Sequence, residues 1–221
     1  MHPESSRSAT VQRIPLWLKL AYSGFLAVMI PVYWIHYGPT NFLYFCDVAL
    51  LLTLAGIWRE GALLISLPAV GILLPQVLWC ADFLAQLCGG KMTGMTSYMF
   101  DAERSLFLRG LSLFHGWLPF LLLYLVRKTG YDRRALLGWT MICIGLCLVA
   151  YFLLPPAGAV LANPQVPRNV NYVFGMDDAK PQQWLPPLAY LGVWISALTC
   201  IIFVPTHLLL KKACSAAGKV S

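Results

Sequence analysis

Six long apolar stretches, separated by shorter polar segments, follow one another along the chain. They cover residues 16–35, 42–58, 62–87, 106–126, 136–154 and 185–210, each to within a few positions. A helix needs ~20 mostly apolar residues to cross the hydrocarbon layer of a membrane. Because open sheet edges cannot satisfy their backbone groups in lipid, all six stretches are predicted to be helices. The pattern therefore predicts a single all-α domain over residues 1–221, a bundle of six transmembrane helices.

The composition supports a membrane protein. Hydrophobic residues make up 59% of the 221 positions and charged residues 11%, whereas a soluble domain carries about 25% charged residues. These values exclude a disordered protein, an ordinary soluble enzyme and a disulfide-stapled secreted domain. The net charge of +7 is attributed to basic residues in cytoplasmic loops and not to a surface that binds nucleic acid. Membrane lipid is the expected partner and nucleic acid is not; the composition does not fix an oligomeric state.

The basic residues predict the orientation of the helices. Six spans place eleven of the sixteen Lys and Arg residues on one side of the membrane: Arg7, Arg13, Lys19, Arg59, Arg127, Lys128, Arg133, Arg134, Lys211, Lys212 and Lys219. Positively charged loops favour the cytoplasmic side, so both termini are expected in the cytoplasm. The first apolar stretch is longer than the core of a signal peptide, and we expect it to remain as the first span.

The loops on the other side differ in length. The first is a tight turn over residues 37–41, and the second covers residues 88–103. The third runs from Pro155 to Trp184 and contains five prolines. A loop near 30 residues exceeds the usual length of a plain connector. Because its centre at 169–174 is too apolar for a linker, we expect it to fold back over the helix ends.

Several polar side chains are predicted at membrane depth. An ionisable group there costs ~2.5–3.5 kcal/mol on insertion scales, and it usually faces the bundle interior or a cavity. At ~1.5 Å per residue, these groups all fall in the same, non-cytoplasmic half of the membrane. We therefore expect a polar pocket open to the outer leaflet. Its expected lining is His36, Asn41, Asp47, Asp82, Arg109 and His115.

The role of these groups stays open at this stage. A pair of Asp47 or Asp82 with Arg109 fixes the register of the helices in one interpretation and serves a function in the other. His115 lies near mid-membrane, next to Gly116 and one turn before Pro119. A neutral imidazole there can act as a general base, a proton relay or a metal ligand. The alternative is a hydrogen bond that only joins two helices.

Metal and disulfide chemistry receive little support. Most of the seven cysteines lie inside predicted spans, and Cys143 and Cys147, four positions apart, are interpreted as packing residues. His36, Asp47, Asp82 and His115 could in principle hold zinc or iron, but the spacing typical of such sites is missing. We therefore expect no metal and no cofactor.

Three short motifs occur in order along the chain: Asn41–Leu50, Phe114-His115-Gly116, and Asn171-Tyr172 ahead of Trp184-Leu185-Pro186-Pro187. Together they resemble the YwaF-type bacterial integral membrane proteins. More distantly they are similar to the eukaryotic ether-lipid-remodelling acyltransferase and to the androgen-induced and tissue-factor-regulating hydrolases of fatty-acid esters of hydroxy fatty acids. The resemblance implies an all-helical protein of the bacterial inner membrane, with Cys46 as nucleophile and His115 as its base. A second assignment, in which Asp47 acts with His115 and Cys46 only packs, stays open.

Two functions follow from these observations. The first is acyl transfer or ester hydrolysis on a lipid, with loop 155–184 as a lid. Replacement of His115 by Ala is then expected to abolish turnover. The expected substrate-binding residues are Arg109, Asp82, His36, Asn41, Asn171, Tyr172 and Trp184.

The second function is a small transporter or a structural membrane subunit whose polar cluster orders the helices. The sequence has no internal repeat, which disfavours a standard carrier fold, and the Pro75-Gln76 motif of PQ-loop transporters occurs only once.

Overall fold

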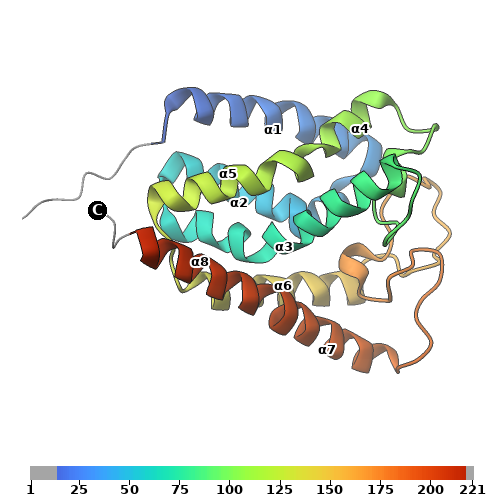
Figure 1. Ribbon diagram of the computed structural model, residues 1–221. Helices are drawn as coiled ribbons and strands as arrows, with labels where there is room; N and C mark the ends of the chain where they lie inside the picture. The colour runs from blue at the N-terminus through green and yellow to red at the C-terminus, as the bar shows by residue number, and fades with distance from the viewer. Residues whose placement is uncertain (1–13, 218–221) are drawn as a thin grey trace, which may run out of the picture.

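The computed structural model describes residues 14–217, and all regular structure in this range is helical (Figure 1). The elements are α1 (Leu16–Tyr37), η1 (Pro39–Leu43), α2 (Phe45–Arg59), α3 (Ala62–Leu87), η2 (Ser97–Met99), α4 (Leu106–Ser112), α5 (Phe114–Thr129), α6 (Ala135–Leu153), η3 (Val170–Tyr172), α7 (Pro187–Ala197), the π-helical turn η4 (Leu198–Phe203) and α8 (Val204–Ala217). Of the basic residues used to predict the orientation, Arg7, Arg13 and Lys219 lie outside the described residues.

Five segments are long and apolar enough to cross a membrane. They are Leu16–Tyr37, Ala62–Leu87, Leu106–Thr129, Ala135–Leu153 and Pro187–Ser215. Lipid favours helices because they satisfy every backbone group internally. The chain is therefore an all-helical, multi-pass integral membrane protein, and these five segments correspond to five of the six predicted stretches.

The remaining predicted stretch is divided between two elements. α2 has 15 residues, a length of ~22 Å, which is short of the ~30 Å hydrocarbon layer. Tyr44, with ψ 143°, is extended and separates α2 from the 3₁₀ turn η1. That turn begins with Gly38 at φ 78° followed by Pro39. Phe42 therefore belongs to η1 and not to the start of a continuous helix.

Prolines remove backbone donors inside two of the long segments, at Pro119 and Pro205. Pro119 has no N–H for the carbonyl of His115, four residues earlier. The Cys80 thiol donates to that carbonyl oxygen at 3.7 Å and so takes the place of the missing backbone donor. In the last segment, Pro205 is the second residue after η4. Because π turns are typical of sites where a helix loses a regular hydrogen bond, we attribute η4 to this proline.

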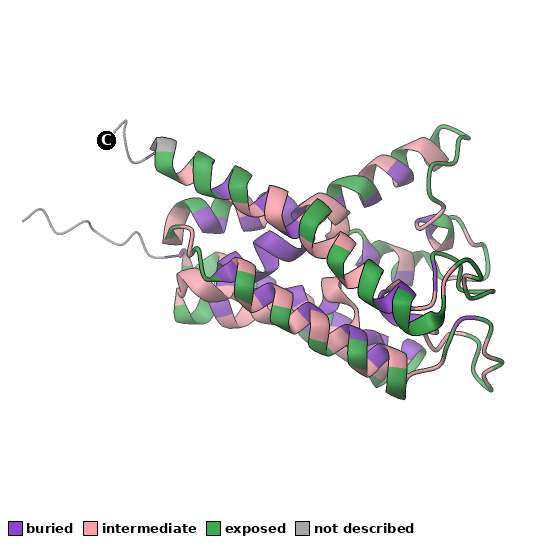
Figure 2. Cartoon of the chain, turned by 90° about the horizontal axis from the view of Figure 1, so that it is seen from below, coloured by how far each residue is buried: buried purple, intermediate pink, exposed green. Residues whose placement is uncertain are grey.

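Helix α3 lies in the middle of the bundle, with α1 on one side and α7 on the other (Figure 1). Every residue of α3 from 65 to 73 is buried, and Figure 2 shows exposed positions along the outer faces of the surrounding helices. Gly71 allows the closest approach, because a Cβ there would lie 1.8 Å from Trp139 of α6. On the α2 side, a Cβ at Gly56 would lie 2.8 Å from the Ile65 side chain.

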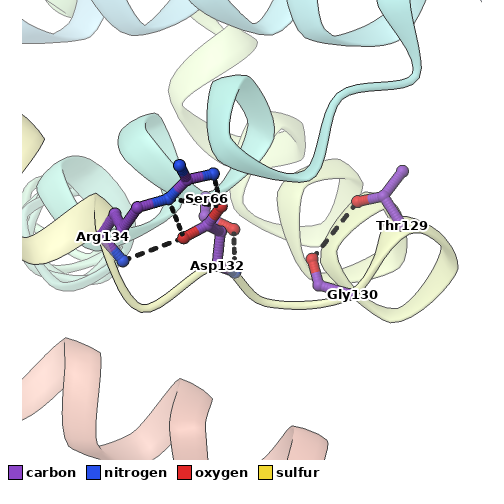
Figure 3. Close-up of polar contacts among 5 residues, drawn as sticks. All are labelled: Ser66, Thr129, Gly130, Asp132 and Arg134. Carbon is purple, nitrogen blue, oxygen red and sulfur yellow. Dashed lines mark hydrogen bonds and ion pairs between the residues drawn. The ribbon is translucent and has the colours of Figure 1, made fainter.

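One end of the bundle collects most of the basic residues, and we call it the basic end: the start of α1, the α2–α3 turn, the α5–α6 turn and the end of α8. Lys19 and Glu60 form an ion pair of 2.6 Å there. At the α5–α6 turn, Asp132 accepts hydrogen bonds from the backbone and side chain of Arg134 (Figure 3). These bonds hold the pKa of Asp132 below its usual value. The Asp132 N–H donates to Ser66 Oγ at 3.0 Å and so joins this turn to α3.

Candidate functional site

The opposite, loop end of the bundle contains a buried carboxylate one turn into α2. Asp47 is 3% exposed. Its Oδ2 accepts a hydrogen bond from Asn41 Nδ2 at 3.4 Å and one from the Cys46 thiol at 3.5 Å. Within residues 14–217, its other oxygen, Oδ1, has no hydrogen-bond partner. The structure thus brings together three of the predicted site residues, and Cys46 and Asp47 contact each other directly. We call Asn41, Cys46 and Asp47 the Asp47 cluster.

The long loop between α6 and α7 contacts the first turn of α2. The Phe45 N–H donates to Asn171 Oδ1 at 3.0 Å, and Asn171 Nδ2 donates to the Leu43 carbonyl at 2.9 Å. Asn171 is buried and has φ 59°, a left-handed conformation that asparagine tolerates better than most residues. Trp194 Nε1 donates to the Asn171 carbonyl at 2.9 Å. The loop therefore covers the first turn of α2, beside the Asp47 cluster. This agrees with the expectation that the apolar centre of the loop folds back over the helix ends.

Replacing Asn171 by Ala is expected to destabilise the protein by about 1–3 kcal/mol, because the Phe45 N–H and the Leu43 carbonyl lose their partner. Thermal unfolding in a mild detergent measures the change. Asn163→Ala, in an exposed part of the same loop, is the control and should unfold like the unmodified protein. Equal stability of the two variants would contradict a holding role for Asn171.

Two tyrosines from the loops lie near Cys46. Tyr98 and Tyr172 lie close enough to Cys46 for a charge on its sulfur to raise the pKa of either phenol. Burial, followed by the Asp178 carboxylate, raises the pKa of Tyr172 to about 12, and burial also raises the pKa of Tyr98. Both hydroxyls therefore keep their protons at neutral pH and can donate hydrogen bonds. Tyr98 also accepts from Trp79 Nε1 at 3.3 Å.

His115, at the start of α5, has its own set of contacts. Its Nδ1 is 2.8 Å from the Ser112 carbonyl. A carbonyl only accepts, so Nδ1 carries the proton and Nε2 the lone pair. The imidazole stacks on Trp79 at 4.8 Å between centroids, and Trp79 in turn bonds to Tyr98. The contacts found for His115 in residues 14–217 thus lead through Trp79 to Tyr98, and none joins His115 directly to Cys46.

Asp82 belongs to a separate group of contacts. This carboxylate is fully buried and accepts hydrogen bonds from the backbone N–H groups of Thr93, Gly94 and Thr96, from Thr96 Oγ1 and from Gln86 Nε2. Arg109 donates to the Met99 carbonyl at 3.1 Å. Among the described residues, neither Asp47 nor Asp82 forms an ion pair with Arg109. The interpretation of a buried Asp–Arg pair that fixes helix register is therefore wrong.

Two of the expected binding residues have only local contacts in the described range. His36 is exposed, and its Nδ1 lies 2.9 Å from the Val32 carbonyl of its own helix. Trp184 is 68% exposed and packs edge-to-face on Tyr190 at 5.7 Å. The structure does not bring these two side chains into contact with the Asp47 cluster.

Other polar residues near the loop end were missed by the sequence reasoning. Tyr33 OH and Ser112 Oγ share a hydrogen bond of 2.8 Å between α1 and α4. Arg104 donates to Tyr37 OH at 3.3 Å and lies over the Tyr98 ring at 5.4 Å. Gln76, named above only as part of a transporter motif and not as a site residue, is 2% exposed and lies in the apolar centre of α3. A lone amide in such a stretch is the one signal that could have pointed to this region.

No protein-family model, curated protein or solved structure matches this chain. Over residues 14–217, no three His, Cys, Asp or Glu side chains lie together as metal ligands would. The arrangement offers a thiol, a carboxylate with one unpartnered oxygen and two protonated tyrosine hydroxyls, at the loop end of a membrane bundle.

Proposed function

We propose that η1 and α2 together form a sixth span and that the basic end faces the cytoplasm of a bacterial inner membrane. From Pro39 to Arg59 the chain has 21 residues, enough for one crossing. Six crossings return both termini to the cytoplasm, and the basic residues favour this orientation. The loop end and the Asp47 cluster then lie toward the outer leaflet.

We further propose that the protein transfers or hydrolyses acyl groups of membrane lipids, with Cys46 as nucleophile. The observation that carries this proposal is the contact between the Cys46 thiol and the buried Asp47 carboxylate. A nucleophile with an adjacent base is the usual signature of covalent catalysis. The resemblance of the motif around Cys46 to YwaF-type proteins and lipid acyltransferases supports the same reaction class.

The proposed reaction has two steps. Cys46 Sγ attacks the acyl carbonyl carbon, and the thiol proton passes to the Asp47 carboxylate. When the carbon–oxygen bond to the leaving alcohol breaks, the alcohol oxygen takes this proton and a thioester remains. Water or a second hydroxyl group then attacks the thioester carbon and gives its proton to the Asp47 carboxylate. When the carbon–sulfur bond breaks, a fatty acid or a new ester leaves and this proton returns to the Cys46 sulfur.

The remaining residues take supporting roles in this proposal. Asp47 accepts a hydrogen bond from the thiol and is therefore favoured as the base over His115, whose contacts in the described range are with other residues. Arg109 lies near the loop end with its Nε unpartnered in the described range, where it is suited to the lipid head group. Asn171 and the loop around it cover the site.

The test is to locate the acyl intermediate. The full chain is placed in vesicles of phosphatidylethanolamine and phosphatidylglycerol whose acyl chains carry a terminal alkyne. After an acid quench, peptide mass spectrometry is expected to find the alkyne chain on Cys46 and to find it removed by hydroxylamine, as for a thioester. Label on another cysteine, or neither label nor lipid turnover, would overturn the proposal and favour a transporter or a structural subunit.

A further inference from the structure

The Gln76 side chain is an unpartnered amide inside the membrane bundle. It is 2% exposed, and within residues 14–217 neither Nε2 nor Oε1 has a hydrogen-bond partner. An unsatisfied buried polar group costs roughly 1–3 kcal/mol, and an apolar residue at this position would avoid that cost. The amide is therefore suited to a ligand that brings its own polar atoms.

The helix geometry directs Gln76 toward α2. Gln76 follows Ile65 by eleven residues. Eleven residues rotate a helix by about 20° more than three full turns. Gln76 therefore lies on nearly the same face of α3 as Ile65, whose side chain and backbone approach Gly56 of α2. Another apolar position of that face, Ile72, is also buried.

The antiparallel register places the amide level with the first turn of α2, which carries the proposed nucleophile. Gly56 and Ile65 lie opposite each other near the tight α2–α3 turn. Eleven residues back along α2 is Phe45, and eleven residues forward along α3 is Gln76. The two positions are therefore level, and Cys46 is the next residue of α2.

We infer that Gln76 Nε2 donates a hydrogen bond to the carbonyl oxygen of the acyl group as Cys46 attacks it. This inference rests on the proposed function. When the sulfur–carbon bond forms, the carbonyl electron pair moves onto oxygen, which becomes an oxyanion. An amide donor fixed in a low-dielectric site stabilises such an oxyanion without reorganisation. The ligand class is thus a carboxylic ester of a long-chain acid, bound through its carbonyl group.

Gln76→Met tests this inference, because it keeps the length of the side chain and removes the donor. In the vesicle assay, the maximal rate of acyl uptake by Cys46 is expected to fall about 10²–10³-fold. The lipid concentration that gives half the maximal rate should change little. The thermal midpoint should stay the same or rise, because a buried unpaired polar group is removed. Gln76→Leu repeats the test with a second apolar side chain.

The matched control is Gln165→Met, which removes a buried glutamine oxygen that is likewise unpartnered in the described chain but belongs to the long loop. Its rate of acyl uptake should equal that of the unmodified protein. If Gln76→Met folds and labels Cys46 at the unmodified rate, or changes only the half-saturating lipid concentration, the inference is overturned while the proposed function stands. If the unmodified protein fails to label Cys46, the proposed function itself is lost.

Discussion

Replacing Asp47 by Asn is expected to lower the rate of acyl uptake by Cys46 about 10²–10⁴-fold, the range in which a positioned general base contributes. The substitution keeps the shape of the side chain, so the hydrogen bond from Asn41 and the packing at the start of α2 are retained in large part. It removes the group that takes the thiol proton. The measurement is the initial rate of hydroxylamine-sensitive label on Cys46 in the alkyne-lipid vesicles.

Two comparisons make this result specific. Asp177→Asn, an exposed carboxylate of the long loop, should label at the unmodified rate. His115→Ala should lose less activity than Asp47→Asn, because among the described residues the imidazole contacts the Ser112 carbonyl and the Trp79 ring and not the Cys46 thiol. A larger loss in His115→Ala would make histidine the base, as the sequence resemblance implies, and would contradict the assignment of Asp47.

The helices were predictable because their signal is strong and local. The stretch predicted at 62–87 is α3 with the same bounds, and the stretch at 136–154 differs from α6 by one residue at each end. Apolar length alone determines such segments in lipid. The division of residues 39–59 into η1 and α2 depends on Gly38, Pro39 and the extended Tyr44, and apolar length does not register backbone breaks of this kind.

The site was predictable only in part. Asn41, Cys46 and Asp47 are close in sequence, so a single helix start brings them together. The predicted depth in the membrane also put Asp82 and Arg109 in the same pocket. Depth does not determine, however, toward which neighbour a side chain points around its helix. The partners of Asp82 come from a loop eleven to fourteen residues later, and this pairing depends on how residues 88–105 fold. Tertiary hydrogen bonds of this type leave no periodic pattern in the sequence.

The largest effect on stability is expected at Asp82. This buried carboxylate accepts three backbone N–H groups of residues 93–96, at 2.7 to 3.0 Å, together with Thr96 Oγ1 at 2.6 Å. Asp82→Ala leaves these donors without their acceptor. Each unsatisfied buried donor costs about 1–3 kcal/mol. Because such costs are not additive, we expect a total loss of about 3–5 kcal/mol in the free energy of unfolding.

The loss at Asp82 should appear first in the loop that it holds. Limited proteolysis of the protein in detergent is expected to cut Asp82→Ala within residues 88–105, under conditions that leave the unmodified chain intact, and the thermal midpoint should fall. Asp101→Asn is the matched control, because Asp101 lies in the same loop and its ion pair with Arg104 is partly exposed; it should resist cleavage. If Asp82→Ala resists proteolysis equally well, these hydrogen bonds do not determine the loop conformation. Asp82 would then return to consideration as a substrate-binding residue.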